Sequence, residues 1–192
     1  MDRAVSGGST TSTWVLGHLA LGLTLLAFGI GHTGAIHGVT AVAAVSLALY
    51  VGGIGLFVAG LFQFRAGDAF AGTAFAGLGA FWFTWGTGVG HQMSAQAAGL
   101  FLVLWALLVV SLTAGSAAAG PLVQCVYGLF AVALLLLAVG QFGGSAGAVR
   151  AGGWFAAMAG LCSWYGATAA LADWPLPLSR RRAAARGVTA GA

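Results

Sequence analysis

The chain has 192 residues, of which 60% are hydrophobic and only 5% are charged, and its mean hydropathy is +0.98. The 81 residues between Asp68 and Arg150 contain no Asp, Glu, Lys or Arg, and neither do the 61 residues between Arg3 and Arg65. A soluble domain of this size needs a charged surface, so the composition excludes one and predicts a protein embedded in lipid.

Apolar stretches of about 20 residues, the length that crosses a bilayer as a helix, follow one another along the chain. There are six, at residues 14–31, 39–64, 69–90, 95–114, 121–142 and 151–173. Helices follow because backbone groups in hydrocarbon must be satisfied within a segment, and the sequence lacks the alternating pattern of a β-barrel. The predicted fold class is an all-α membrane protein with six transmembrane helices.

The predicted domain plan is simple. Residues 1–13 form an N-terminal segment, residues 14–173 form the transmembrane domain and residues 174–192 form a basic tail. The leader lacks the small-residue cleavage pattern of a signal peptide, so the first helix is expected to be retained. Glycine is abundant, with 33 residues, which suits closely packed membrane helices.

Arginine placement predicts the orientation. With six spans, both termini face the same side, and a cytoplasmic position for them leaves only Arg150 outside. The arginines inside are then Arg3, Arg65, Arg180, Arg181, Arg182 and Arg186. By the positive-inside rule we predict a multi-pass protein of the cell (inner) membrane with both termini in the cytoplasm. The net charge of +4 then reflects topology and anionic lipid rather than nucleic acid.

An internal similarity relates the two halves of the chain. Residues 76–82 in the third span resemble residues 159–165 in the sixth, and residues 59–64 resemble residues 138–142 more weakly. Three spans per repeat give the second copy the opposite polarity, so the pattern predicts inverted repeats with a pathway narrowest near the midplane. Chance similarity between helices rich in glycine and alanine is the alternative.

Several kinds of chemistry are excluded by residue types that the chain lacks. It has no Lys, which excludes a Schiff base, and no Glu, while Asp173 lies at the end of the last span, which excludes a proton relay through buried carboxylates. Cys125 and Cys162 lie in predicted spans without metal or redox spacing, so they are interpreted as packing residues. We expect no metal, no cofactor and no enzymatic activity.

The histidines fall into two groups. His32, His37 and His91 lie in or beside predicted extracellular connections, where titration near neutral pH is reasonable, so they are pH-sensing candidates. Ordinary solvated loop histidines are the alternative. His18 lies about one turn inside the first span without a second histidine at its depth, which argues against haem.

The polar side chains predicted within the membrane are uncharged. Such groups can hydrogen-bond a small solute without trapping it, or they can join helices to one another. The candidate lining residues are Thr24, Thr73, Thr84, Gln124, Gln141, Ser163 and Tyr165, together with His18.

Motifs in the second and third spans resemble those of a known family. They are Tyr50-Val51-Gly52-Gly53-Ile54, Ala59-Gly60-Leu61-Phe62, Gly67-Asp68-x-Phe70, Thr73-Ala74-Phe75 and Phe81-Trp82-Phe83-Thr84. Supporting matches follow at Leu104-Trp105, Gln124, Ala138-x-Gly140, Gly153-Trp154 and Tyr165. Their order over about residues 16–172 resembles the succinate–acetate permease family, also called the acetate uptake transporter or YaaH family.

The resemblance implies a six-helix membrane fold, typically hexameric, that passes acetate and sometimes succinate through a pore in each protomer. It also implies a hydrophobic constriction, at positions that align with Leu21, Leu78 and Phe130. We expect the Phe130 ring to face the lumen, so that its truncation costs little stability. His18, about one turn below Leu21 on the same helix face, is expected to face the cytoplasmic vestibule.

Two features depart from the family pattern. The family begins its first span with Asn-Pro-x-Pro-Leu-Gly, whereas here the run is Ser12-Thr13-Trp14-Val15-Leu16-Gly17. Ser12 or Thr13 still offers a cap for a helix start that attracts anions. Leu56 replaces a polar Gln that is typical of the second span.

The sequence therefore predicts a membrane channel or proton-linked facilitator for small monocarboxylates, acetate first, with succinate or lactate as further substrates. Its expected partners are the carboxylate, protons, membrane lipid and further copies of itself. One alternative is a channel for a neutral solute such as urea or ammonia. Another is a non-transporting scaffold that associates through small-residue faces such as Gly55/Ala59 and Gly152/Ala156/Gly160.

Overall fold

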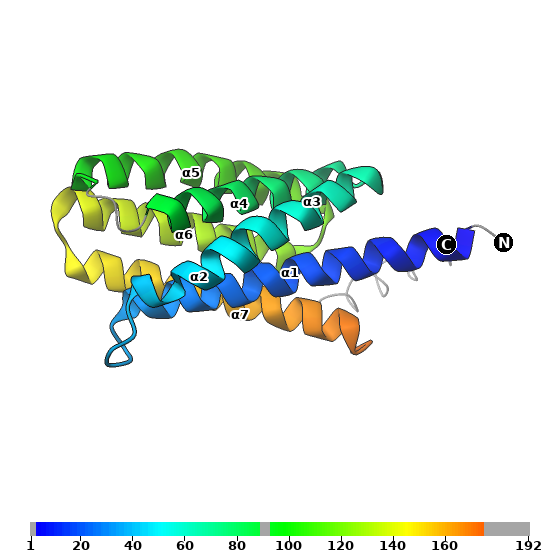
Figure 1. The fold of residues 1–192 in the computed structure, drawn as a ribbon, viewed down its shortest axis with the longest axis horizontal. Helices are drawn as coiled ribbons and strands as arrows, with labels where there is room; N and C mark the ends of the chain where they lie inside the picture. Colours follow the sequence, from blue (N-terminus) through cyan, green and yellow to red (C-terminus); the bar gives the residue numbers. More distant parts are fainter. Residues whose placement is uncertain (1–2, 89–92, 175–192) are drawn as a thin grey trace, which may run out of the picture.

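The computed structural model describes residues 3–88 and 93–174, and all regular elements within these ranges are helical (Figure 1). The first helix is α1 (Arg3–Thr33). The second segment changes its winding three times, from η1 (Ala41–Ala44, 3₁₀) through α2 (Val45–Leu47) and η2 (Ala48–Gly55, π-helical) to α3 (Leu56–Arg65). The remaining elements are α4 (Ala69–Gly88), α5 (Ala95–Gly115), η3 (Ser116–Ala118), α6 (Pro121–Gly143) and α7 (Ala146–Leu171).

Within the described ranges, four helical stretches are both long and apolar enough to cross a membrane. They are Ser12–Thr33, Ala41–Arg65, Ala95–Ala118 and Pro121–Gly143. Helices α4 and α7 have comparable lengths but contain more glycine and tryptophan, and α7 also carries Arg150. The prediction of an all-helical membrane protein is confirmed, and the count of six spans stays a prediction.

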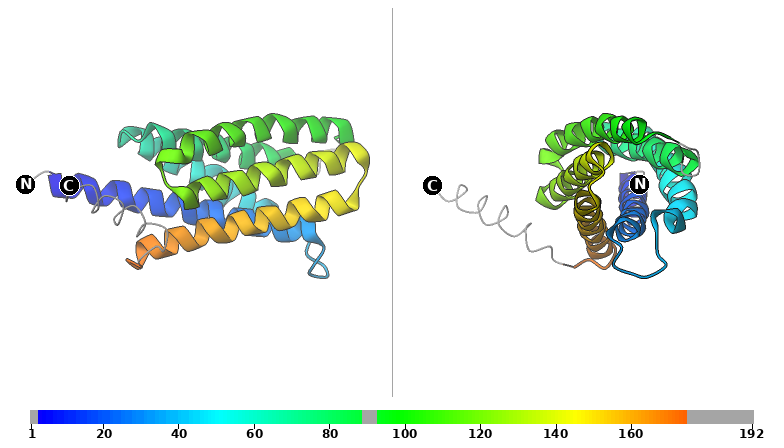
Figure 2. Two further views of the ribbon diagram at one scale, coloured as in Figure 1. Left: turned by 180° about the vertical axis from the view of Figure 1, so that it is seen from behind. Right: turned by 90° about the vertical axis from the view of Figure 1, so that its left-hand side faces the viewer.

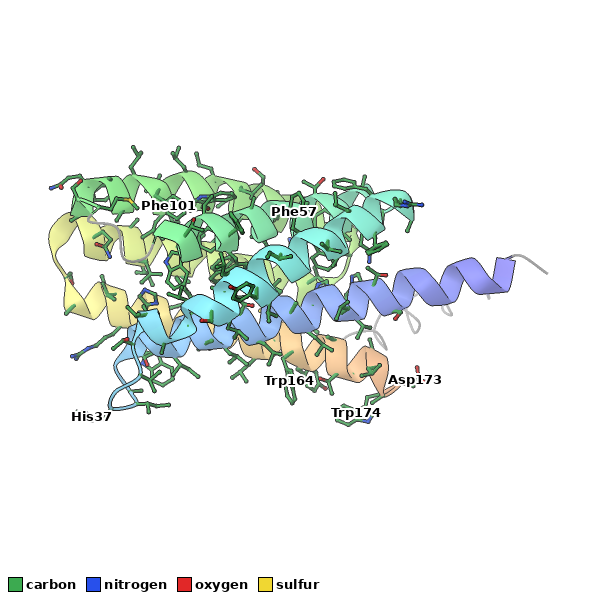
Figure 3. All side chains as sticks on the ribbon, in the orientation of Figure 1. His37, Phe57, Phe101, Trp164, Asp173 and Trp174 are labelled. Carbon is green, nitrogen blue, oxygen red and sulfur yellow. The ribbon has the colours of Figure 1, made fainter. Side chains whose placement is uncertain are left out.

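The long helices lie side by side and alternate in direction, and seen along their axes they follow one another around the molecule in chain order (Figure 2). The loop with His37 lies at one end, and Asp173 and Trp174 lie at the other (Figure 3). We call these the His37 end and the Asp173 end. The turn between α3 and α4 lies at the Asp173 end, where α1 extends beyond the other helices (Figure 1).

Helix α7 closes the ring against α1 through glycines that allow the two backbones to touch. A Cβ atom on Gly22 would lie 2.8 Å from the backbone nitrogen of Trp164, and one on Gly160 would lie 2.8 Å from the carbonyl oxygen of Gly22. Gly29, seven residues after Gly22 on α1, and Gly153, seven residues before Gly160 on the antiparallel α7, repeat this contact. Side chains at these positions would force the helices apart, so the glycines set the α1–α7 distance.

This packing corrects the expectation that Gly152, Ala156 and Gly160 form a face for other copies of the chain. All three are buried within the protomer. Gly160 faces α1, and Gly152 faces Leu137 of α6. Close-packing glycines serve contacts within a protomer as readily as contacts between protomers, and the sequence does not distinguish the two.

Two helices begin earlier than predicted. The first predicted span begins at residue 14, but α1 already begins at Arg3, so Ser12 and Thr13 lie inside the helix and neither can cap its start. Helix α7 begins at Ala146 rather than at residue 151, because the Ser145 hydroxyl accepts a hydrogen bond from the Ala148 N–H at 3.3 Å. Arg150 is therefore part of a helix and not of a connection.

Candidate functional site

An aromatic cavity of about 150 Å³ opens between α1, α4, α5 and α6 near the His37 end. Its walls are mostly apolar, with three polar side chains among them. The lining residues are Phe28, His32, Thr84, Trp85, Gly88, Met93, Ala98, Phe101, Leu102, Leu137 and Gln141. Figure 3 marks Phe101 on α5. A mostly apolar pocket with few polar groups is typical of a site for a small molecule.

A second cavity, of about 470 Å³, lies further towards the His37 end, and we call it the Arg150 cavity. It is lined by Gly31, His32, Gly34, Val39, Thr40, Gly140, Gln141, Gly144, Ser145, Ala146, Val149 and Arg150. His32 and Gln141 line both cavities, so they form their common boundary. Sequence reasoning did not name Arg150 as a site residue, although its position as a lone charge after 81 uncharged residues was a usable signal.

Below the aromatic cavity, rings from three helices close the interior. Phe28 of α1 lies 5.1 Å from Trp82 of α4, measured between ring centroids. Phe130 of α6 stacks on Trp82 at 5.8 Å with 10° between the ring planes, and it meets Phe81 edge-on at 5.7 Å. All four side chains are fully buried. We call Phe28, Phe81, Trp82 and Phe130 the aromatic cluster.

Of the predicted constriction residues, Phe130 belongs to this cluster, and Leu78 lies one turn before Trp82 on α4. His18 of α1 meets Phe75 of α4 at 5.0 Å, and Phe28 meets Trp82, so α1 and α4 run in the same direction. Leu21 and Leu78 each follow the first pair by three residues, which places both about 4.5 Å further along, at one depth. Leu21, Leu78 and Phe130 are fully buried. Their role as the narrowest point stays a prediction.

The Phe130 ring is packed between other rings and does not face an open lumen. The expectation of a small stability cost on its truncation is therefore wrong. Removal of a buried Phe side chain costs about 3–5 kcal/mol.

His18 is held from several sides. Its ring lies 4.0 Å from the Trp14 ring, and its Nδ1 lies 3.1 Å from the Trp14 carbonyl oxygen. The Ser163 hydroxyl of α7 donates a hydrogen bond to the His18 carbonyl oxygen at 2.8 Å. The side chain is only 3% exposed and lines neither of the two cavities, so it does not face an open vestibule. Its Nε2 atom has no hydrogen-bond partner.

The π-helical segment η2 brings Gly52 against Thr24 and Trp82. A Cβ atom on Gly52 would lie 2.6 Å from Thr24 Cγ2 and 2.8 Å from Trp82 Cγ. The Thr24 hydroxyl donates to the Ala20 carbonyl at 2.8 Å, and the Trp82 Nε1–H is buried without a partner. Thr24 is therefore inside the bundle, beside an unsatisfied donor. π-Helical turns within helices frequently mark functional sites.

The other predicted lining residues separate into two groups. Thr84 and Gln141 line the aromatic cavity, and Ser163 is buried against α1. Thr73, Gln124 and Tyr165 are exposed on the outside of the protomer, away from both cavities. The Thr73 hydroxyl donates to the Ala69 carbonyl, and Gln124 donates to the Thr113 carbonyl at 3.4 Å. We therefore leave these three residues out of the proposed pathway.

The predicted pH-sensing histidines differ in their surroundings. His32 is partly buried, with its Nδ1 at 2.8 Å from the Phe28 carbonyl oxygen and its ring beside both cavities. His37 is exposed on the loop after α1 (Figure 3). His91 lies outside the described residues, as do Arg180, Arg181, Arg182 and Arg186.

Comparison with known proteins identifies the family of this chain. The model of the GPR1/FUN34/yaaH family matches residues 6–175. The chain belongs to this family. The resemblance inferred from the motifs of the second and third spans is thereby confirmed.

Individual relatives give further detail. The chain is 27% identical to the succinate-acetate/proton symporter SatP of Escherichia coli K12 over 159 residues, covering 78% of this chain and 82% of that one. It is 29% identical to ammonia transport outward protein 2 of Saccharomyces cerevisiae over 140 residues, covering 67% of this chain and 50% of that one. A solved structure of the bacterial acetate channel SatP superposes with a TM-score of 0.79 at 25% identity, covering 86% of this chain and 97% of that one.

Proposed function

We propose that this chain is a membrane channel or proton-linked facilitator for small monocarboxylates, with acetate as the first substrate and lactate or succinate as further ones. The observation that carries this proposal is the likeness to the bacterial acetate channel over 86% of the chain. The related symporter for succinate, acetate and protons supports it. So does an interior of uncharged polar groups and aromatic rings.

The proposed pathway runs along the inside of the bundle. The Arg150 guanidinium attracts the carboxylate anion to the Arg150 cavity, where it takes a proton from the external solution, and the neutral acid passes His32 and Gln141 into the aromatic cavity. It then crosses the aromatic cluster and the Leu21–Leu78–Phe130 level, passes His18 and leaves at the Asp173 end. Thr24, Thr84 and Ser163 supply polar contacts along this route.

The energetics favour passage as the neutral acid. A bare carboxylate at the bilayer centre costs at least about 2.5–3.5 kcal/mol, and the aromatic cluster offers no cation to offset that cost. The undissociated acid carries no charge across this barrier and brings its own proton. Coupling to protons then needs no carboxylate relay in the protein.

The assembly and orientation belong to the same proposal. Residues 14–173 form the transport domain with six spans in two inverted repeats, and residues 1–13 and 174–192 are cytoplasmic. We propose a homo-oligomer, a hexamer by family resemblance, with one pore per protomer in the inner membrane. Exposed large apolar side chains on α3 and α5, such as Phe57, Phe62, Leu104 and Leu107, are available to lipid or to neighbouring copies. Figure 3 marks Phe57 on α3.

A second candidate function, passage of ammonia or another small neutral solute, is favoured by one specific observation. The yeast relatives at 29% identity are described as ammonia transport outward proteins. The chain spans about half of their length, so their activity is a weaker guide. A neutral solute would also cross the aromatic cluster without a charge penalty.

The test is uptake of labelled acetate, lactate, urea and methylammonium into proteoliposomes, with protein-free liposomes as the baseline. We expect acetate uptake above baseline that rises as the external pH is lowered. Uptake of methylammonium or urea without acetate uptake would select the second candidate.

A further inference from the structure

The His18 imidazole is an unusual group to find buried in an otherwise uncharged helix. In the described part of α1 from Ser12 to Thr33 there is no Asp, Glu, Lys or Arg, and His18 is 3% exposed. Only two buried side-chain nitrogen or oxygen atoms among the described residues lack a hydrogen-bond partner, His18 Nε2 and Trp82 Nε1. Buried polar atoms are nearly always paired, so each of these two is a candidate contact for a passing solute.

The hydrogen bond at the other ring nitrogen fixes the chemistry of His18 Nε2. Nδ1 lies 3.1 Å from the Trp14 carbonyl oxygen, which can only accept, so Nδ1 carries a hydrogen and donates it. In the neutral imidazole, Nε2 then holds a lone pair and is an acceptor. The Trp14 and Phe75 rings hold the imidazole plane, and the Ser163 hydroxyl anchors its backbone. The acceptor is therefore preorganised.

The surroundings favour the neutral form of this imidazole. Helix α4 has no ionisable side chain between Ala69 and Gly88. On the nearby part of α7 the ionisable groups are the Cys162 thiol and the Tyr165 phenol, and neither forms a hydrogen bond to the His18 ring. The nearest carboxylate on the chain before Phe75 is Asp68, seven residues earlier, and it accepts a hydrogen bond from the Ala71 N–H. A buried imidazolium would thus find no counter-charge on α4 or on this part of α7, which is costly in a low-dielectric interior.

We propose that His18 Nε2 accepts a hydrogen bond from the O–H of the undissociated acid just beyond the constriction, and so selects the protonated form of the substrate. This inference rests on the proposed function and specifies which form of the substrate is recognised. A carboxylate anion has only acceptor oxygens, so it meets the Nε2 lone pair with repulsion. The protonated acid donates its O–H to Nε2. This one contact gives a partner both to the buried acceptor and to the donor of the acid.

The contact at His18 differs from a contact at Trp82, because one atom is a hydrogen-bond acceptor and the other is a donor. Trp82 Nε1–H is a donor and can bond either the carbonyl oxygen of the acid or an oxygen of the anion, so it does not favour the protonated form. His18 Nε2 alone distinguishes a solute that carries a hydrogen from one that does not. His18 lies three residues before Leu21 on α1, so this discrimination occurs on the Asp173 side of the constriction.

The first test is spectroscopic and uses the full-length protein in nanodiscs. The protein is labelled with ¹⁵N-histidine, and the His18 resonances are assigned by their loss in His18→Gln. Acetate is added at pH 5 and at pH 8, each compared with an acetate-free sample at the same pH. We expect the Nε2 resonance to move upfield with acetate at pH 5 and to stay unchanged at pH 8. A resonance unmoved at pH 5, or moved equally at both values, would overturn the inference.

The second test measures flux in proteoliposomes. The amide of His18→Gln reaches the position of Nε2 and keeps an acceptor there, whereas His18→Leu removes it. Thr113→Val is the matched control, since the Thr113 hydroxyl bonds only within α5. We expect acetate influx at pH 5 to fall about tenfold in His18→Leu, the effect of one lost hydrogen bond, and to be retained in His18→Gln and in the control.

The outcomes separate the inference from the proposed function. Wild-type protein that carries acetate, with equal flux in His18→Leu, overturns the role of His18 and leaves the transport function standing. Wild-type protein without acetate flux overturns the transport function. The spectroscopic test uses the wild-type chain, so it decides the binding claim even where His18→Leu fails to fold.

Discussion

Truncation of Phe130 to alanine tests the constriction most strongly. The ring fills the interior between three helices, stacked on Trp82 at 5.8 Å and edge-on to Phe81 at 5.7 Å. Its removal opens a space beside Trp82 and Phe81 on the proposed route. We expect faster acetate flux and entry of larger acids such as lactate.

The magnitudes follow from the packing. Loss of a fully buried Phe side chain lowers the free energy of unfolding by about 3–5 kcal/mol, within which each aromatic pair accounts for about 0.5–1.5 kcal/mol. If the ring contributes about 1.4 kcal/mol to the barrier for lactate, its removal raises lactate flux about tenfold. The variant should therefore be less stable and more permeable at the same time.

The assay combines two measurements on one preparation. Thermal unfolding in detergent reports the stability, and initial rates of labelled acetate and lactate uptake in proteoliposomes report the selectivity. Phe142→Ala is the control, because Phe142 lies on the same helix and is 51% exposed. A Phe130→Ala protein that is folded but has the same lactate-to-acetate ratio as wild type would refute the constriction.

Further predictions concern packing, entry and assembly. Gly153→Ala should lower the free energy of unfolding by about 1–3 kcal/mol, because its Cβ would lie 2.8 Å from the Gly29 carbonyl oxygen. Gly147→Ala should not, because its Cβ would make only an ordinary contact, 3.8 Å from the Ser145 hydroxyl oxygen; chemical denaturation compares the two variants. Arg150→Gln should slow acetate uptake at low ionic strength and match wild type at 1 M salt, where charge steering is screened; equal rates at both would contradict the entry role. Native mass spectrometry from nanodiscs should give a hexamer, and a uniform monomer would contradict the assembly.

The sequence was sufficient for the helices because lipid imposes a simple requirement on them. A long apolar run has to be helical, and the segments predicted from residues 95–114 and 121–142 agree with α5 and α6 to within a residue or two. The start of α7 was misjudged because Arg150 was taken to mark a connection. The charge is tolerated in the first turns of the helix, near the His37 end, where the Arg150 cavity opens.

The site was harder to predict, because the sequence does not show whether a polar residue in a membrane helix faces the interior of the bundle or its outside. Thr73 and Thr84 have the same local pattern, a hydroxyl bonded to the carbonyl four residues earlier, yet only Thr84 lines a cavity. The π-helical segment η2 had only its glycine-rich sequence as a signal. The orphaned Nε2 of His18 depends on contacts from α1, α4 and α7 together, which no local pattern contains.

The central claim is that a monocarboxylic acid crosses each protomer as a neutral molecule. Proteoliposomes with a trapped pH indicator, with the membrane potential set by potassium and valinomycin, measure this directly when an inward acetate gradient is applied. We expect lumenal acidification faster than in protein-free liposomes, at a rate that does not change with the membrane potential. Acetate entry that follows the membrane potential without acidification would show passage of the anion and contradict the account.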